Sequence, residues 1–294
     1  MSRAARLVIA AVLLAAVASC ARDVAVGHED ALASAGGEPG GGAPPTTAGT
    51  TDALDAGASG NGGTGEDGGN GGSGGTPSGD EPSGPLLWSA DHETATFEQW
   101  LGDGTGIQYE QRSGQLEPTT EHAHSGSYAF SAAITTDDGE LHQAMMGRNV
   151  RLREGRYGAW FFLPESPRAD YWVILKLSNG ATTDRFDLDI EAREGAAAHL
   201  RLFEHPNTWI TEPASVAFPI GRWVHVEVLY RSSPNADGRL LVRQDGQMVL
   251  DSGSRVTASD DRVTFYCGSA SRFVAPSPFR LFIDDASIHA DVLP

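Results

Sequence analysis

Three carboxylates alternate along one short segment, Asp187-Leu188-Asp189-Ile190-Glu191. Residues two apart in an extended strand point to the same face, so these acids would form a row with about 6.5–7 Å between neighbouring Cβ atoms. Like charges this close raise one another's pKa, which lets one carboxyl act as an acid and another as a nucleophile. The spacing suits glycoside hydrolysis, and it equally suits a strand whose polar face meets solvent.

A second set of side chains would suit removal of the proton beside a uronate carboxylate. This lyase chemistry needs a base, such as histidine or tyrosine, and a cation or amide that neutralises the carboxylate. Candidates in predicted strands are Tyr171, Lys176, His199, Arg201 and His225. We take His225 as a catalytic candidate beside the three acids, although a histidine on a sheet face is often a hydrogen-bonded structural residue.

Glycan binding needs aromatic rings that stack on sugar faces and a few polar groups that orient hydroxyls. Trp172 alternates with Lys176 along one strand, opposite the apolar set Tyr171, Val173 and Leu175. If that apolar set forms the core, Trp172 and Lys176 face the ligand. The predicted ligand-binding residues are Trp172, Lys176, Arg201 and Trp209.

The elements that would position these residues are strands, because the dominant hydrophobic period is two. Val224, Val226 and Val228 alternate with more polar residues, as do Leu188 and Ile190. The dipeptide Asp245-Gly246 between two extended stretches is a strong hairpin signal. Residues 85–294 therefore predict one all-β domain, an antiparallel two-sheet jelly-roll β-sandwich.

Composition narrows the class of partner. Residues 85–294 hold 29 acidic and 18 basic side chains, a net charge of about −11 that argues against nucleic acid as a partner. Cys267 is the single cysteine of this region, so we expect it to be a buried small hydrophobe.

The first residues predict export and lipid anchoring. Residues 1–19 have basic residues followed by an apolar run too short to span a bilayer, as in a signal peptide. Val17-Ala18-Ser19-Cys20 resembles the lipobox of bacterial lipoproteins, which implies acylation at Cys20 and, from the two residues that follow, the outer membrane of the cell envelope. The glycine-rich stretch that completes residues 20–84 is predicted to be a disordered linker.

The order of features in residues 86–290 resembles the concanavalin A-like jelly-roll superfamily, within it the heparin-lyase-like and laminarinase-like enzymes and the laminin-G-like modules. The stretches that carry this resemblance are Ser125–Ala129, Arg156–Pro164, Tyr171–Lys176, Gly221–His225 and Leu281–Ile288. The resemblance implies a glycan groove on the concave face of one sheet. It also implies a nucleophile at Asp187, which is one methylene shorter than the glutamate of laminarinase-type hydrolases.

The same resemblance implies a structural Ca²⁺ site. Asp284 in the closing strand would combine with oxygen ligands from the first strand region, which Glu93, together with Asp91 and Glu98, could supply. No other cofactor is expected.

The sequence thus favours a membrane-tethered lipoprotein whose jelly-roll domain binds an envelope or extracellular polysaccharide. A polysaccharide lyase or an endo-glycosidase acting in the same groove is the first alternative. A non-catalytic adhesion or envelope-structural module is the second. The sequence leaves the oligomeric state open.

Overall fold

A computed structural model of the chain describes residues 84–179, 185–192, 196–206 and 208–293. The predicted signal peptide, the lipidated Cys20 and the linker up to residue 83 lie outside these described residues. Within them, no helix has both the length and the apolar character that a membrane span requires.

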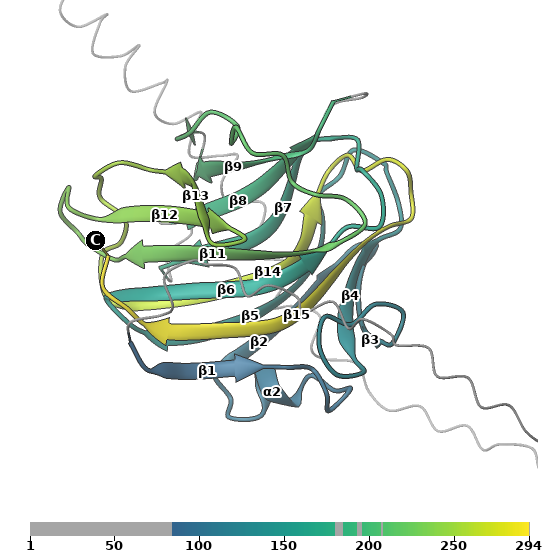
Figure 1. The fold of residues 1–294 in the computed structure, drawn as a ribbon, viewed down its shortest axis with the longest axis horizontal. Coiled ribbons are helices and arrows are strands. Elements are labelled where there is room, and N and C mark those ends of the chain that lie inside the picture. Colours follow the sequence, from purple (N-terminus) through teal and green to yellow (C-terminus); the bar gives the residue numbers. More distant parts are fainter. Residues whose placement is uncertain (1–83, 180–184, 193–195, 207, 294) are drawn as a thin grey trace, which may run out of the picture. The chain divides into compact units, whose positions relative to one another are not determined.

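The described chain folds into two antiparallel sheets, which Figure 1 shows as two layers. The eight-stranded sheet contains β1 (Leu86–Ala90), β3 (Gly114–Thr119), β4 (Ala129–Ile134), β6 (Glu154–Phe162), β11 (Trp223–Arg231), β12 (Arg239–Gln244), β13 (Gln247–Asp251) and β15 (Phe279–Ala290). The seven-stranded sheet contains β2 (Gly106–Gln111), β5 (His142–Arg151), β7 (Ala169–Ser178), β8 (Arg185–Ala192), β9 (His199–Glu204), β10 (Thr208–Trp209) and β14 (Arg262–Ser271). A single helical turn, α2 (Glu98–Leu101), links β1 to β2. The predicted all-β, two-sheet sandwich is confirmed.

Strand order explains how distant parts of the chain meet. The eight-stranded sheet runs β13-β12-β11-β6-β15-β4-β3, with β1 paired to β15, and the seven-stranded sheet runs β10-β9-β8-β7-β14-β5-β2. The strands with the predicted acidic row and basic residues, β7, β8 and β9, are therefore adjacent in one sheet. The strand with His225, β11, belongs to the other sheet.

The period-two pattern packs one core between the two sheets. Val224, Val226 and Val228 from β11 are buried in the same cluster as Leu188 and Ile190 from β8. Burying such a side chain contributes roughly 1.5–3 kcal/mol. Because alternate residues point to opposite faces, this core fixes Asp187, Asp189 and Glu191 on the outer face of the seven-stranded sheet.

The predicted outward position of Trp172 is wrong, and a β-bulge is the reason. The pairing of β7 with β8 shifts between Val173 and Leu175, so Ile174 and Leu175 both reach the core. Before the bulge Trp172 points inward, where it is fully buried and donates from Nε1 to Ser269 Oγ at 2.6 Å. After the bulge Lys176 points outward, as predicted. One extra residue thus reverses the alternation within a single strand.

Two smaller sequence predictions are confirmed. Asp245 and Gly246 connect β12 to β13, and both have positive φ, 49° and 79°, as a two-residue type I′ hairpin requires. Cys267 is a fully buried free cysteine of the core, and burial raises the pKa of its thiol. The thiol is therefore a packing group and not a nucleophile.

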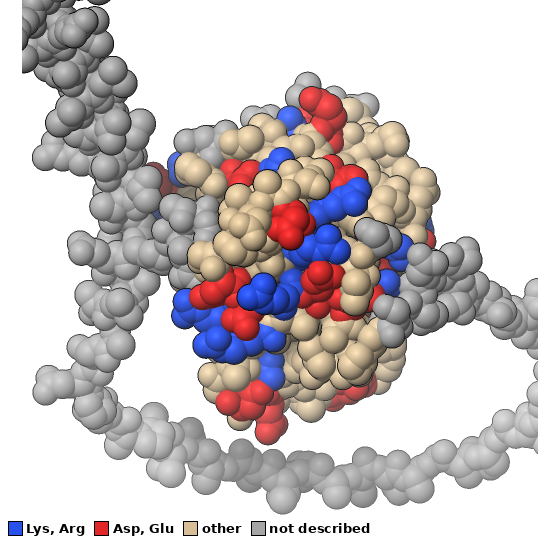
Figure 2. All heavy atoms as spheres, turned by 90° about the vertical axis from the view of Figure 1, so that its left-hand side faces the viewer, with Lys and Arg blue, Asp and Glu red and all other residues tan. Residues whose placement is uncertain are grey.

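The charged surface is mixed on the side that Figure 2 shows, where basic and acidic side chains lie next to one another. Exposed basic and acidic side chains of the described residues also form ion pairs, for example Arg262–Asp260 at 2.6 Å and Arg151–Asp261 at 3.2 Å. Each such pair contributes little to stability, typically about 0–1 kcal/mol. This side of the molecule does not form a continuous basic surface.

Candidate functional site

The outer face of the seven-stranded sheet brings together most of the predicted site residues. We call its charged part the acidic face and define it by Lys176 on β7, Asp187, Asp189 and Glu191 on β8, and Arg201 on β9. The three acids are buried, with exposed fractions of 3 %, 2 % and 9 %. They form the floor of the acidic face, so a ligand would meet their more exposed partners first.

Each acid of this row has a basic neighbour. Asp187 lies opposite Lys176 in the β7–β8 pairing, and its Oδ2 also accepts a hydrogen bond from Nε2 of His205 at 2.9 Å. Asp189 lies opposite Arg201 in the β8–β9 pairing, and Glu191 accepts a bond of 3.0 Å from the same guanidinium. Acidic and basic side chains are therefore paired with one another across three strands and do not form separate patches.

Arg201 also fixes the most exposed aromatic ring of the site. Its guanidinium carbon lies 4.1 Å from the ring centroid of Trp209, and its Nε donates to Thr211 O at 3.1 Å. Phe203 meets the same indole edge-on, with 4.9 Å between ring centroids. Trp209 is 37 % exposed although it is packed on these two side chains. The ring is thus held in one orientation while part of it faces solvent.

An apolar strip with a tyrosine at either end lies beside the acids. Met145, Val173 and Ala270 form a small cluster separate from the main core, and the half-buried Tyr171 and Tyr266 pack against it. Burial raises the pKa of Tyr171, so its hydroxyl keeps its proton at neutral pH and can donate a hydrogen bond.

Sequence reasoning missed several members of this surface. Gln143 on β5 accepts a hydrogen bond from Lys176 Nζ at 2.8 Å, and neither Gln143, Tyr266 nor Met145 was predicted. Their strands, β5 and β14, are distant from β7 and β8 in the sequence. Only the strand order of the sheet brings them together, and no local pattern encodes it.

His225 does not belong to this site, so its predicted place beside the three acids is wrong. It lies on β11, on the outer face of the eight-stranded sheet, where its ring stacks on Trp160 with 4.9 Å between centroids. The ring of His124 also stacks on Trp160, with 3.7 Å between ring centroids. Burial lowers the pKa of His225, which keeps the ring neutral. The arrangement is that of a packed histidine.

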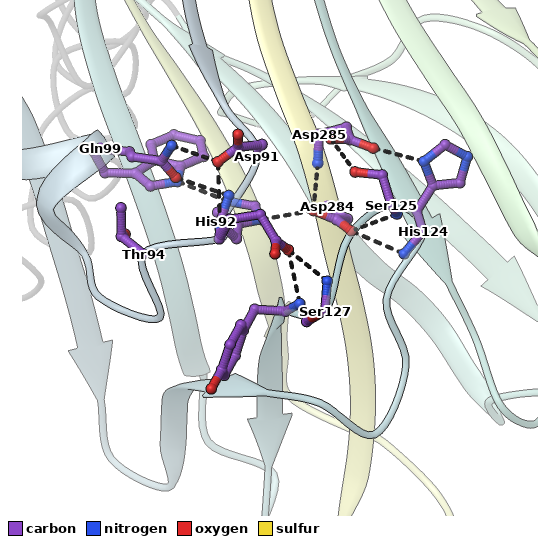
Figure 3. Close-up of polar contacts among 12 residues, drawn as sticks. Asp91, His92, Thr94, Gln99, His124, Ser125, Ser127, Asp284 and Asp285 are labelled. Carbon is purple, nitrogen blue, oxygen red and sulfur yellow. Dashed lines mark hydrogen bonds and ion pairs between the residues drawn. The ribbon is translucent and has the colours of Figure 1, made fainter.

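The predicted calcium ligands are held by hydrogen bonds to protein groups, as Figure 3 shows. Asp284 is fully buried, and its Oδ2 accepts the backbone N–H groups of His124 and Ser125. Its Oδ1 lies 3.3 Å from Nδ1 of the buried His92 and accepts the backbone N–H of Asp285. Four donors thus converge on one carboxylate.

The proton on His92 can be assigned from its second partner. The indole N–H of Trp100 can only donate, and it lies 3.1 Å from Nε2 of His92. Nε2 must therefore accept, so Nδ1 carries the proton and donates it to Asp284. The neutral imidazole links two buried groups in one chain of hydrogen bonds.

Glu93 also accepts backbone hydrogen bonds from the loop that contains His124 and Ser125. Its Oε1 accepts the backbone N–H groups of Ser127 and Tyr128, both at 2.8 Å. Ca²⁺ prefers six to eight oxygen ligands, whereas this loop directs N–H groups at both carboxylates. The described residues also contain no cluster of three or more His, Cys, Asp or Glu side chains arranged around a metal position. From these contacts we expect Asp284 and Glu93 to serve as acceptors for this loop and not as calcium ligands.

A thermal-denaturation experiment tests this reading. Occupancy of a calcium site at a hundred times its dissociation constant would add about 2.7 kcal/mol, or roughly 5–10 °C for a domain of this size. We expect melting temperatures in excess Ca²⁺ and in excess chelator to agree within about 1 °C. A rise of several degrees with Ca²⁺ alone would show that the folded chain binds the ion and would contradict this expectation.

The comparisons with known proteins confirm the jelly-roll fold. No protein-family model matches the sequence, and no curated protein matches it. Among solved structures, endo-β-1,4-glucuronan lyase from the fungus Trichoderma reesei is similar at 13 % identity, with a TM-score of 0.55 over 70 % of this chain and 96 % of that one. The cellulose-induced protein Cip1 has 14 % identity and a TM-score of 0.52 over 70 % and 98 %. A mutant of the alginate lyase Aly36B in complex with an alginate trisaccharide has 14 % identity and a TM-score of 0.50 over 71 % and 99 %.

These likenesses define the class of protein by its fold. The described chain is a jelly-roll β-sandwich, an architecture that it shares with the compared lyases. At such low identity the scaffold carries no assignment of activity, which has to be argued from the side chains of this chain.

Proposed function

We propose that this chain binds a polysaccharide on the outer face of its seven-stranded sheet. The observation that carries the proposal is the Trp209 ring, exposed at the edge of the acidic face and held in place by Arg201 and Phe203. A fixed indole can stack on a sugar face without losing much conformational freedom, which favours binding.

The neighbouring groups suit the remainder of a sugar chain. Tyr171 and Tyr266 flank an apolar strip, and His199, His205 and Arg201 supply partly exposed polar atoms. Binding sites for small ligands commonly combine such apolar surface with a few polar groups that fix the orientation of the ligand. The buried acids beneath hold Arg201 and His205 in position.

Lyase activity is the second candidate, and one contact favours it. His205, one quarter exposed, is paired with the buried Asp187 in the manner of a base held by a carboxylate. In such a reaction the base removes the proton at C5 of a uronate, the C4–O bond breaks as a C4=C5 double bond forms, and the departing oxygen takes up a proton to become a hydroxyl. Lys176 and Arg201 are the cations of the acidic face that could neutralise the carboxylate, and both already have partners there.

Hydrolysis through the acidic row has less support. A glycosidase needs two carboxyl groups that reach the scissile bond from opposite sides. Here Asp187 is committed to His205 and Glu191 to Arg201, and both are buried. The geometry therefore favours a binding protein over a hydrolase.

The cellular setting is a further part of the proposal. We infer from the lipobox-like sequence that Cys20 carries lipid and that the protein is held at the cell envelope, at the outer membrane. In cells given a labelled fatty acid, the native chain should incorporate label and partition with membranes. A Cys20→Ser chain should do neither, and label retained by that variant would contradict the assignment.

A panel of polysaccharides tests the function itself. The Cys20→Ser chain is mixed with insoluble or immobilised polymers of different charge and linkage, and retention, new reducing ends and ultraviolet-absorbing unsaturated products are measured. Retention without either product is the expected result. Unsaturated products would establish the lyase, and absence of retention on every polymer would leave an adhesion or structural module.

A further inference from the structure

We infer that the glycan bound on the acidic face carries no carboxylate groups. The inference deepens the proposed function and rests on it. It starts from the register of three adjacent strands, which places a carboxylate directly opposite Lys176 and another directly opposite Arg201. Lys176 faces Asp187 across the β7–β8 pairing, and Arg201 faces Asp189 across the β8–β9 pairing.

The distance between the acid and the base of each pair determines whether the acidic face attracts or repels a charged ligand. Directly opposed residues in an antiparallel pair have Cβ atoms about 4.5–5.5 Å apart. A uronate that approached Arg201 would therefore come near Asp189, and near Glu191 as well, which holds the guanidinium at 3.0 Å. Two unit charges about 5 Å apart repel each other even in the dielectric of water. The three carboxylates of the acidic face outnumber its two cations, so repulsion exceeds attraction and each uronate would lose its hydration without a compensating ion pair.

Uncharged sugars meet the opposite situation. Their hydroxyls can donate to carboxylate oxygens and accept from Arg201 and the protonated Tyr171, and none of these contacts places a second net charge on the face. The face of a neutral pyranose also matches the indole of Trp209. The same groups that disfavour a polyuronate therefore favour a neutral polymer.

The test uses two ligands that differ only at C6 of each sugar, which is a hydroxymethyl group in one and a carboxylate in the other. Soluble oligosaccharides of a β-1,4-glucan and of the corresponding β-1,4-glucuronan, of equal length, are titrated against the Cys20→Ser chain. We expect the neutral ligand to bind at least tenfold more tightly. The weak binding of the glucuronan should strengthen as salt is added, because salt screens repulsion.

Two variants locate the effect. Asp189→Asn removes one negative charge from the acidic face and should shift the ratio of the two affinities about threefold to tenfold toward the glucuronan. Glu117→Gln removes one negative charge from the exposed surface of β3 in the other sheet and should leave the ratio unchanged. Thermal melting confirms that each variant is folded, and the salt dependence of the native chain gives an independent reading if Asp189→Asn is not.

The possible outcomes separate the two claims. Tighter binding of the glucuronan, weakened by salt, would overturn the inference about the ligand and leave polysaccharide binding intact. An unchanged ratio in a folded Asp189→Asn chain would also overturn it. If neither oligosaccharide nor any polymer of the panel binds, the proposed function itself fails.

Discussion

Replacing Trp209 by alanine is expected to weaken binding of the retained polysaccharide about 10- to 100-fold, which corresponds to about 1.4–2.8 kcal/mol. The variant removes the exposed ring that Arg201 and Phe203 hold in place, and with it the stacking surface for a sugar. Titration calorimetry with soluble oligosaccharide measures the change. Trp209→Phe keeps a smaller ring and should lose only part of the affinity.

The matched control is Trp223, a half-buried tryptophan on the eight-stranded sheet. Its ring packs edge-on against His124. Its strand, β11, belongs to a different sheet from β8 and β9. A folded Trp223→Ala chain should bind the polysaccharide as the native chain does. If Trp223→Ala abolishes binding and Trp209→Ala does not, the ligand lies on the other sheet.

Replacing Asp284 by alanine is expected to lower the free energy of unfolding by about 3–5 kcal/mol, since the substitution leaves buried donors without an acceptor. The N–H groups of His124, Ser125 and Asp285 and the Nδ1–H of His92 all converge on this carboxylate. For a domain of about 200 residues, the melting temperature should fall by about 10 °C.

The variants Asp285→Asn and Asp284→Asn distinguish the loss of a buried hydrogen-bond acceptor from the loss of a negative charge. Asp285 accepts hydrogen bonds from His124 and Ser125 but is about a quarter exposed, so Asp285→Asn should shift the melting temperature only slightly. Asp284→Asn keeps one acceptor oxygen and should fall between the native chain and Asp284→Ala. Equal melting temperatures for Asp284→Ala and Asp285→Asn would show that the buried carboxylate has no special role.

The sequence was sufficient for the sandwich because each strand shows its two faces in a local alternation. That alternation placed Asp187, Asp189 and Glu191 on one face. It failed at Trp172, where a bulge at Val173–Leu175 reverses the inward and outward positions. Bulges depend on the partner strand, so an isolated strand pattern does not reveal them.

Non-local pairing was the second limit. Alternation shows which side chains share a face of a strand, but it does not show which sheet the strand joins, and His225 was misplaced for that reason. The contact between His92 and Asp284 joins residues 192 apart in the sequence. A carboxylate that accepts backbone N–H groups has the same sequence signature as one that could bind calcium, and only the folded loop distinguishes the two.

Fluorine NMR of the Cys20→Ser chain labelled with 5-fluorotryptophan tests the central claim most directly. The chain contains six tryptophans, and single Trp→Phe variants assign their signals. On titration with the retained oligosaccharide, the account predicts that the Trp209 signal shifts while those of the fully buried Trp100 and Trp172 stay in place. A shift of Trp160 or Trp223 with an unchanged Trp209 signal would contradict binding on the seven-stranded sheet.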